Sequence, residues 1–263
     1  MSVQYDNISS LYHERRASDV GLKEKETVKQ ILSPIIKGAT VLDLACGFGF
    51  YTYDLIEWGA DHVTAVDISH SMLLQSKRSA GYAKHSSRVQ LIEADASIPH
   101  AYPGGPFDAV IGIWFLNYAP DRETLTRMFA SISLNLKDGG IFVGVLLPPS
   151  DDPVAEYDVG SLVHLGFPTL LIENAGPVAD GMRVRAHLRT DRGSGEFEFF
   201  HLKKGTFESA AREGGMMGPV MWVRTQEVAA QDLIVDESQD QEERFKQLTP
   251  HFFSCFVACK TSD

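Results

Sequence analysis

The stretch from residue 40 to residue 52 constrains the fold of this chain more than any other part of the sequence. It reads TVLDLACGFGFYT, an apolar run that ends at Asp43 and is followed by Gly47 and Gly49. This order is typical of a buried strand, then a tight turn where backbone approaches a ligand, then a helix start. A second apolar run ends at Asp67. A carboxylate at such a strand end can accept from a ribose diol, so the segment predicts a nucleotide-like ligand.

The glycine spacing separates two kinds of nucleotide-like site. A dinucleotide-binding turn follows the pattern G-x-G-x-x-G, in which the third glycine lets the helix pack on the strand. Here Thr52 occupies the third position after Gly47 and Gly49, and in the frame that starts at Ala45 the third position is Phe50. Neither frame fits a dinucleotide site. A plain strand–turn–helix without a ligand stays open as the structural alternative.

The pattern Asp-x-Ala-x-Gly-x-Gly resembles the first motif of class I S-adenosylmethionine-dependent methyltransferases of the small-molecule type. Ala45 stands where that family more often has glycine. The resemblance continues in order through residues 63–69, 89–96, 107–118 and 136–143. It implies an α/β, Rossmann-like fold with a seven-stranded, mostly parallel sheet, helices on both faces and a substrate-capping insert. The implied cofactor is S-adenosyl-L-methionine.

Hydrophobic patterning predicts the same core without reference to any family. Apolar strand-like runs at 41–45, 63–66, 89–92, 109–113 and 141–147 alternate with helical patterns at 50–58, 71–82 and 122–136. Such alternation favours a parallel sheet covered by helices. Ligands of these sheets bind beyond the carboxyl ends of the strands. We therefore expect Asp43, Asp67, Asp95 and Ile113 to converge at one edge.

Together with the segments around this core, the sequence predicts a chain of four parts. Residues 1–36 form an N-terminal helical lid with a helix over 22–36, and residues 37–149 form the cofactor-binding core. Residues 150–205 form a substrate cap, irregular or weakly helical over 151–176, with a hairpin of strands 183–188 and 196–202. Residues 206–263 complete the core sheet through a helix capped by Thr206, a strand at 220–224, a polar helix or loop at 239–247 and a last strand at 252–258. In the resembling family the last two strands form a reversed hairpin at the sheet edge.

The resemblance also implies which residues contact the cofactor. Asp67 corresponds to the ribose-binding position, although a helix cap is its structural alternative, and Asp95 to the acceptor for the adenine amino group. Tyr12 and Arg16, four positions apart, would share one helix face and reach the cofactor carboxylate; Arg15 competes for that role, and a solvated terminus is the alternative. The full predicted set is Tyr12, Arg16, Asp43, Ala45, Gly47, Asp67, Ile68, Met72, Asp95, Ala96 and Ile113.

The acceptor side of the site carries weaker signals. Trp114 and Asn117 are predicted substrate-binding residues, because in the resembling family the segment after the fourth strand borders both the methyl group and the acceptor. Tyr157, which lies in the predicted cap, is the third predicted substrate-binding residue. Tyr118 and His164 are the predicted catalytic residues, although no general base stands out among the titratable residues of the cap. His has the suitable pKa for deprotonation near neutrality. The other candidates in the cap are Glu156, Tyr157, His187 and His201.

Composition narrows the partners. The net charge is −11 and the pI is near 5.3, with no stripe of Lys and Arg, which argues against nucleic acid. No 18-residue apolar stretch predicts a membrane span, and the start lacks a secretory signal, so we expect a cytoplasmic protein. Three cysteines without companion ligands predict neither disulfides nor a metal site. The oligomeric state stays open.

The sequence therefore predicts methyl transfer to an O, N or S atom of a small metabolite. A partly apolar acceptor is favoured by apolar residues clustered in the cap, which are Leu162, Val163, Leu165, Phe167, Leu170 and Leu171. Two alternatives stay open. One is a protein on the same fold that binds the cofactor but catalyses a non-methylating reaction, and the other is a protein methyltransferase.

Overall fold

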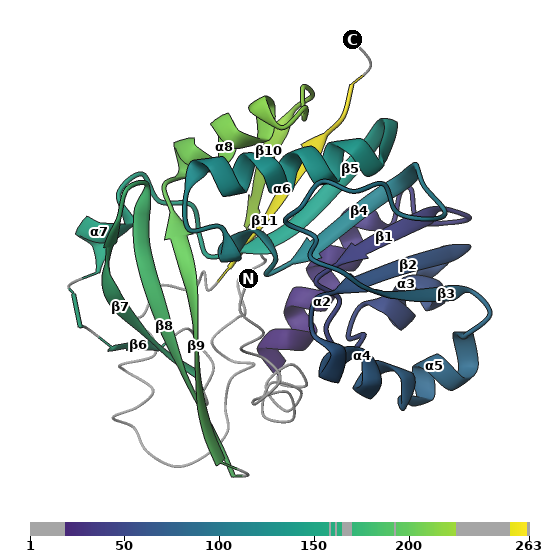
Figure 1. Ribbon diagram of the computed structural model, residues 1–263, viewed down its shortest axis with the longest axis horizontal. Helices are drawn as coiled ribbons and strands as arrows, with labels where there is room; N and C mark the ends of the chain where they lie inside the picture. The colour runs from purple at the N-terminus through teal and green to yellow at the C-terminus, as the bar shows by residue number, and fades with distance from the viewer. Residues whose placement is uncertain are drawn as a thin grey trace.

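Two β-sheets organise the chain in a computed structural model that describes residues 19–157, 159–160, 162–164, 170–191, 193–224 and 253–261 (Figure 1). Sheet A has seven strands in the order β10-β11-β5-β4-β1-β2-β3. Their bounds are β1 (Thr40–Leu44), β2 (His62–Asp67), β3 (Val89–Glu93), β4 (Phe107–Ile113), β5 (Leu136–Leu146), β10 (Val220–Arg224) and β11 (Ser254–Cys259).

Sheet A is parallel except at one edge. Strands β1 to β5 run in the same direction, whereas β11 pairs antiparallel with both β5 and β10. This is the predicted seven-stranded, mostly parallel sheet with a reversed hairpin at its edge, and that fold prediction is confirmed. Because β1 to β5 are parallel, their carboxyl ends meet at one edge, as predicted for a ligand site.

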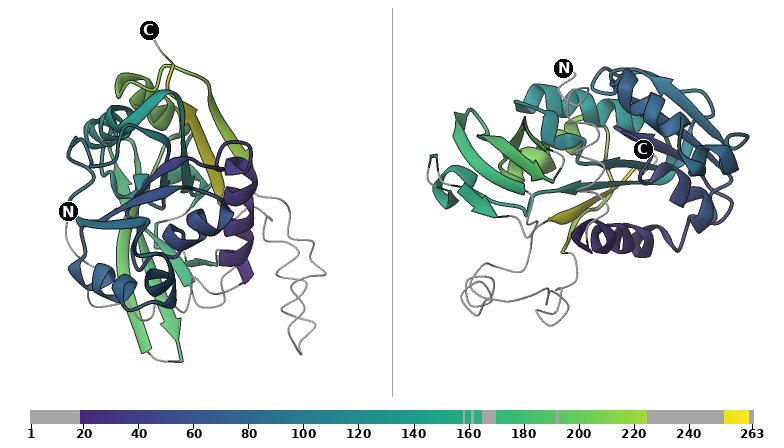
Figure 2. Two further views of the ribbon diagram at one scale, coloured as in Figure 1. Left: turned by 90° about the vertical axis from the view of Figure 1, so that its right-hand side faces the viewer. Right: turned by 90° about the horizontal axis from the view of Figure 1, so that it is seen from below.

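Helices cover both faces of sheet A (Figure 2). Alternate strand residues face opposite ways: Ile111 and Val143 pack with Val28 of α2, whereas Val110 and Phe142 pack with other helices on the opposite face. In both views of Figure 2, α2 lies across the sheet from α6 and α8. The helices are α2 (Asp19–Leu32), α3 (Thr52–Trp58), α4 (His70–Lys77), α5 (Ala80–His85), the 3-10 helix η2 (Leu116–Tyr118), α6 (Arg122–Asn135), α7 (Pro153–Glu156) and α8 (Lys204–Glu213).

Sheet B is a four-stranded antiparallel sheet beside the carboxyl edge of sheet A. Its strands, in the order β6-β7-β8-β9, are β6 (Leu162–His164), β7 (Leu170–Val178), β8 (Gly181–Thr190) and β9 (Gly193–Leu202). One face is buried and mainly apolar, with Ile172, Val184, Ala186, Phe197 and Phe199 in the same core cluster as α2 and α3. The Asn117 Nδ2 group donates to the Phe200 carbonyl (3.4 Å) and joins the two sheets.

Three predicted elements differ from the structure. The segment 151–176 is not irregular throughout, because its last residues belong to β7. There the buried residues Leu170, Ile172 and Asn174 alternate with less buried ones. Thr206 does not cap α8: the helix begins at Lys204, and Thr206 is buried inside its first turn. The helix predicted at 71–82 is two helices, because Ser79 accepts from the Tyr82 amide and starts α5.

Two further predictions concern the start and the end of the chain. The helix predicted over 22–36 is α2, which begins at Asp19 and ends at Leu32, before the Ser33-Pro34 pair that disfavours helix. The segment 239–247 lies outside the described residues. The boundaries of the four predicted parts stay predictions.

Candidate functional site

The loop between β1 and α3 runs through three residues with left-handed backbone. Ala45, Gly47 and Gly49 have φ angles of 57°, 58° and 88°. A Cβ on Gly49 would lie 2.6 Å from Tyr53 Cε2 and 2.8 Å from Ser76 Oγ, so the loop packs tightly there. A Cβ on Gly47 would meet no atom of the described residues within 4 Å. The loop is therefore fixed on one side at Gly49, while the backbone of Gly47 borders open space that a ligand can fill.

Asp67, at the end of β2, holds this loop. Its Oδ2 accepts from the Gly47 amide (2.8 Å) and its Oδ1 from the Ser69 amide (2.8 Å). The cap of α4 is Ser69, whose hydroxyl accepts from the Met72 amide (3.2 Å). The carboxylate is half-buried beside the open space at Gly47. Asp67 thus lies at the end of β2, at the sheet edge where the ligand was expected, and its bond to the Gly47 amide also holds the loop in shape.

Asp43 stabilises the loop from its buried side. It is 2% exposed, and its Oδ2 accepts from the Thr52 hydroxyl (2.6 Å) at the start of α3. Cys46, between Ala45 and Gly47, is also buried. Burial, followed by the nearby Asp67 and Asp43 carboxylates, raises the pKa of the Cys46 thiol well above its usual range. The loop therefore presents backbone groups and no reactive thiolate.

The predicted adenine-side residues follow β2 and β3. Ile68 is half-buried and Met72 is 2% exposed in the first turn of α4. Asp95 Oδ1 accepts from the Ser97 amide (2.9 Å) and hydroxyl (2.6 Å), and Ala96 beside it is buried. The structure thus places these four residues after neighbouring parallel strands, at the same edge as Asp67.

The end of β4 contributes Ile113, and the segment after it contributes Trp114, Asn117 and Tyr118. Trp114 has φ 61°, and its Nε1 donates to Glu24 Oε2 of α2 (2.9 Å). Asn117 is 2% exposed, and its buried Oδ1 has no donor within the described chain. Burial raises the pKa of the Tyr118 phenol well above its ordinary value. The phenol therefore stays protonated and suits hydrogen-bond donation rather than proton abstraction.

The predicted site residues of the cap are only partly described. Tyr157 follows α7, is half-buried and packs against the same core as Trp114 and Tyr118. Burial, and then the Glu156 carboxylate, raises the pKa of its phenol. His164 belongs to β6, but its side chain lies outside the described part of the structure, as do Tyr12 and Arg16.

Two buried polar residues matter beyond the predicted set: His201, which the sequence offered only as one of several cap candidates, and Glu24, which it did not single out. His201 in β9 is 3% exposed; its Nε2 lies 3.0 Å from the Pro148 carbonyl, which can only accept, so Nδ1 carries the lone pair. Nδ1 has no donor within the described chain, and burial lowers the pKa of the ring to about 4. The alternation Phe197, Phe199, His201 was a signal that would have separated this histidine from His187.

The second buried residue is Glu24 in α2, which is 0% exposed. Its Oε1 accepts from the Tyr51 hydroxyl (2.7 Å), and Oε2 accepts from Trp114. Four-residue spacing to Val28 and Leu32, both buried, places Glu24 on the inward face of the helix. That spacing is visible in the sequence and could have identified it.

The rest of the described chain adds no metal centre. Among those residues no group of three His, Cys, Asp or Glu side chains could hold a metal ion. No helix in the described ranges is long and apolar enough to cross a membrane. Two grooves flank Asp138 and Lys260 at the amino end of β5, which is the sheet edge opposite the predicted site.

Comparison with known proteins matches the part of the chain that contains the loops after β1, β2, β3 and β4. Residues 41–140 match the family described as "Methyltransferase domain". Phosphoethanolamine N-methyltransferase 3 of Arabidopsis thaliana is 29% identical over 44% of this chain and 23% of its own length. The 18S rRNA (guanine(1575)-N(7))-methyltransferase of Saccharomyces cerevisiae is 34% identical over 43% of this chain and 42% of its own length. The chain thus spans less than half the length of these curated relatives.

The fold as a whole has solved counterparts. An amino pentose methyltransferase from Micromonospora echinaspora, solved with S-adenosylmethionine bound, superposes with a TM-score of 0.59 at 17% identity. The superposition covers 97% of both chains. At this identity the likeness concerns the fold, and it extends over the whole chain rather than the matched domain alone.

Proposed function

We propose that this chain, built around a class I methyltransferase domain and using S-adenosylmethionine as its cofactor, transfers a methyl group to an O, N or S atom of a small, partly apolar metabolite. One observation carries the proposal. Asp67 holds the Gly47 amide at a loop position where an added Cβ would meet no atom of the described chain within 4 Å, at the carboxyl edge of a parallel sheet. A cofactor that is bound through backbone and a ribose diol needs this arrangement.

The cofactor half of the site then has defined tasks. Bound S-adenosylmethionine supplies a methyl group already activated by its sulfonium, so the protein mainly orients and desolvates. In the proposal Asp67 accepts from the ribose hydroxyls, Asp95 faces the adenine, and Gly47 leaves room for the ligand. Asp43 acts indirectly, because its carboxylate is buried and accepts from Thr52. Tyr12 and Arg16 keep their proposed role at the cofactor carboxylate.

The acceptor half is proposed to lie where η2, α7 and sheet B meet. Trp114, Asn117 and Tyr157 would contact the acceptor. The buried Asn117 Oδ1, which lacks a donor in the described chain, supports a bound group that carries an N–H or O–H. Tyr118 would donate a hydrogen bond, since its pKa is raised by burial. His164 remains a proposed catalytic residue, and His201 joins it as a neutral hydrogen-bond acceptor.

The predicted four-part division belongs to this proposal: a lid at 1–36, the cofactor core at 37–149, the substrate cap at 150–205 and the sheet completion at 206–263. The alternatives are a non-methylating reaction on the same fold and transfer to protein. The rRNA methyltransferase among the relatives adds RNA to the possible acceptors. A net charge of −11 argues against RNA, because phosphate contacts supply most of the affinity for it.

Two measurements test the proposal. Calorimetry with S-adenosylmethionine, S-adenosylhomocysteine and NAD asks which ligand binds, and we expect the first two alone. Tight NAD binding without a response to the others would refute the cofactor assignment. Mass spectrometry then follows a methyl-deuterated cofactor into a metabolite extract, an amino sugar panel, phosphoethanolamine, intact proteins and RNA. We expect a labelled small molecule, and label in protein or RNA would select an alternative. Binding without label in any pool would favour the non-methylating alternative.

A further inference from the structure

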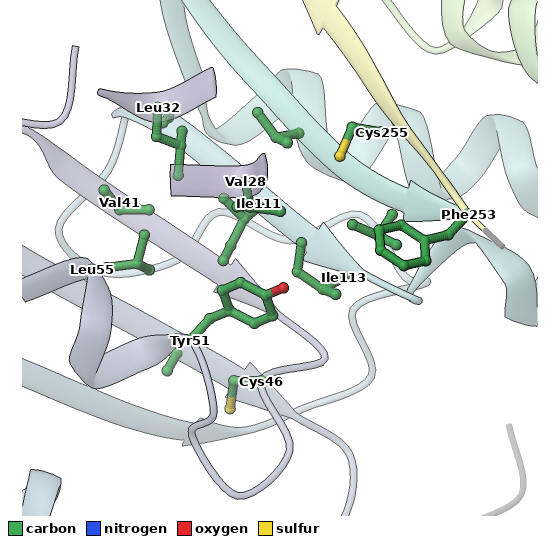
Figure 3. Packing of buried hydrophobic residues seen from close by; sticks show 14 of the residues in the cluster. Val28, Leu32, Val41, Cys46, Tyr51, Leu55, Ile111, Ile113, Phe253 and Cys255 are labelled. Carbon is green, nitrogen blue, oxygen red and sulfur yellow. The ribbon is translucent and has the colours of Figure 1, made fainter. Parts of the chain in front are cut away.

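Glu24 joins two loops that are far apart in the sequence. Tyr51 ends the loop of the first motif, just before α3, and Trp114 directly follows β4. Both donate to the same buried carboxylate, at 2.7 Å and 2.9 Å. Figure 3 shows Tyr51, Ile113 and Phe253 in the layer beside Val28 and Leu32 of α2. The proposed cofactor side and acceptor side of the site therefore meet at one side chain of α2.

Packing alone does not explain a carboxylate at this position. Burying a charged group costs free energy unless hydrogen bonds compensate, and α2 already packs through Val28 and Leu32. An apolar residue would continue that stripe without the cost. What the carboxylate adds is two directed hydrogen bonds, one to each loop.

Trp114 is the partner whose conformation most needs support. Its φ of 61° is in the left-handed region, which is unfavourable for a residue with a Cβ. Its amide donates to the Val145 carbonyl (3.0 Å), and its ring lies edge-on to Phe253 with centroids 6.4 Å apart. With Glu24 on the indole nitrogen, backbone, ring and polar edge are all fixed, and the indole has one defined orientation.

We propose that Glu24 is a positioning residue that transmits the state of the cofactor loop, through Tyr51, to the orientation of the Trp114 indole. This inference rests on the proposed function, since it presumes that the loop binds S-adenosylmethionine and that Trp114 borders the acceptor. Ligand binding at the loop would shift Tyr51, and the shared carboxylate would pass that shift to the indole. Glu24 touches neither ligand in this scheme.

The test follows the indole N–H signals of the full ¹⁵N-labelled chain by NMR. The chain has three tryptophans, so Trp114→Phe identifies the Trp114 signal by its loss. The probe is S-adenosylhomocysteine. In the wild type we expect saturating probe to move the Trp114 signal. In Glu24→Ala we expect a shift at least about threefold smaller, with Glu24→Gln between the two because its amide can still bond both partners.

A matched control uses the same helix. Glu26 is two residues away with a side chain 58% exposed, so Glu26→Ala removes a carboxylate without touching either loop, and its shift should equal that of the wild type. Tyr51→Phe, which deletes one hydroxyl, should reduce the shift as Glu24→Ala does, and it provides the same test if Glu24→Ala does not fold.

The outcomes separate the inference from the proposed function. If the probe binds and the Trp114 signal moves equally in wild type, Glu24→Ala and Tyr51→Phe, the link through Glu24 is wrong and the cofactor assignment stands. An unmoved Trp114 signal in wild type with bound probe overturns the link as well. If the wild type does not bind the probe at all, the proposed function fails and takes the inference with it.

Discussion

The two sheets use polar residues in opposite ways. At the carboxyl edge of sheet A, buried or half-buried carboxylates hold loops: Asp43 accepts from Thr52, and Asp67 from the Gly47 amide. In sheet B the charged residues lie on the outer face and bond across strands, with Glu173 between Arg185 and His187. In sheet A these polar groups shape the loops of the candidate site, whereas in sheet B they link neighbouring strands of the same sheet.

This difference indicates how the site divides its tasks. The loops of sheet A must keep a fixed shape to receive one cofactor, and short-range hydrogen bonds from the strand ends supply it. Among the described buried residues, the inner face of sheet B is apolar apart from Asn174 and His201, whose bonds go to the Tyr157 and Pro148 carbonyls. Such a face can change its side chains, and with them the acceptor it covers, without altering the cofactor loop.

The largest expected effect tests the cofactor loop at its two glycines. Gly49→Ala should lower the free energy of unfolding by about 3 kcal/mol, because the new Cβ would lie 2.6 Å from the Tyr53 ring in a left-handed position. Gly47→Ala has open space around its Cβ and should cost only the backbone strain, about 1 kcal/mol. Chemical denaturation measures both.

Calorimetry completes that comparison. We expect Gly47→Ala to weaken S-adenosylhomocysteine binding at least tenfold while the fold persists, because its methyl group occupies the space left for the ligand. Equal stability losses in the two variants, with cofactor affinity unchanged in Gly47→Ala, would contradict the division between a packing glycine and a ligand-facing glycine.

The core around this loop was predictable because its signals are local. The turn glycines, the carboxylates at strand ends and the alternation of strand and helix all lie within short windows, and the structure confirms the sheet that they predict. What the sequence did not provide was the pairing of those groups. That Asp67 binds the Gly47 amide, and that Glu24 reaches Trp114, depends on chain segments brought together by folding.

The second prediction concerns Asp67. Asp67→Ala should weaken cofactor binding by about 1–3 kcal/mol, because ribose hydroxyls would lose a charge-assisted acceptor. The structure adds that the Gly47 and Ser69 amides also lose their partner. Asp67→Asn keeps one oxygen acceptor and should lose less. An unchanged dissociation constant in a folded Asp67→Ala variant would assign this residue to loop structure alone.

The third prediction concerns His201 of β9, which bonds the Pro148 carbonyl, and it uses the pH dependence of stability. Burial lowers the pKa of His201 to about 4, whereas an unfolded histidine has about 6.5, so between these values the unfolded chain binds more protons. The contribution of His201 to stability is complete above pH 6.5 and is lost as the pH falls toward 4. At pH 5 the loss is on the order of 2 kcal/mol.

His201→Gln isolates the pH-dependent contribution of His201 to stability, since glutamine can donate to the Pro148 carbonyl but does not titrate. The gap in unfolding free energy between pH 7 and pH 5 should be larger for the wild type than for this variant. Parallel pH profiles for the two proteins would show that the imidazole is hydrated in the native state, and its proposed place as a buried acceptor would be lost.

Sheet B was harder to predict because its signal is spread over partner strands. The hairpin of β8 and β9 follows from alternation on both sides of a Gly-containing turn, and the predicted hairpin is confirmed with longer strands. Strand β7 was missed, since its buried residues 170, 172 and 174 include an asparagine, and the sequence Leu-Leu-Ile blurs the period of two. Its inward Asn174 makes sense only with the Tyr157 carbonyl that accepts its Nδ2 (2.7 Å).

The smallest expected effect belongs to the outer face of sheet B. Glu173→Gln keeps the size of the side chain but removes the charge that faces Arg185 at 3.4 Å and His187 at 3.0 Å. Partly exposed ion pairs contribute little, so the variant should lose about 0.5–1 kcal/mol, and 1 M salt should reduce the difference from wild type because it screens the charges. Cofactor affinity and methyl transfer should match those of the wild type, since this face points away from the core that sheet B shares with α2 and α3. A loss of turnover in a stable Glu173→Gln variant would mean that the charged face takes part in acceptor binding, and the contrast between a site-forming sheet A and a self-pairing sheet B would have to be abandoned.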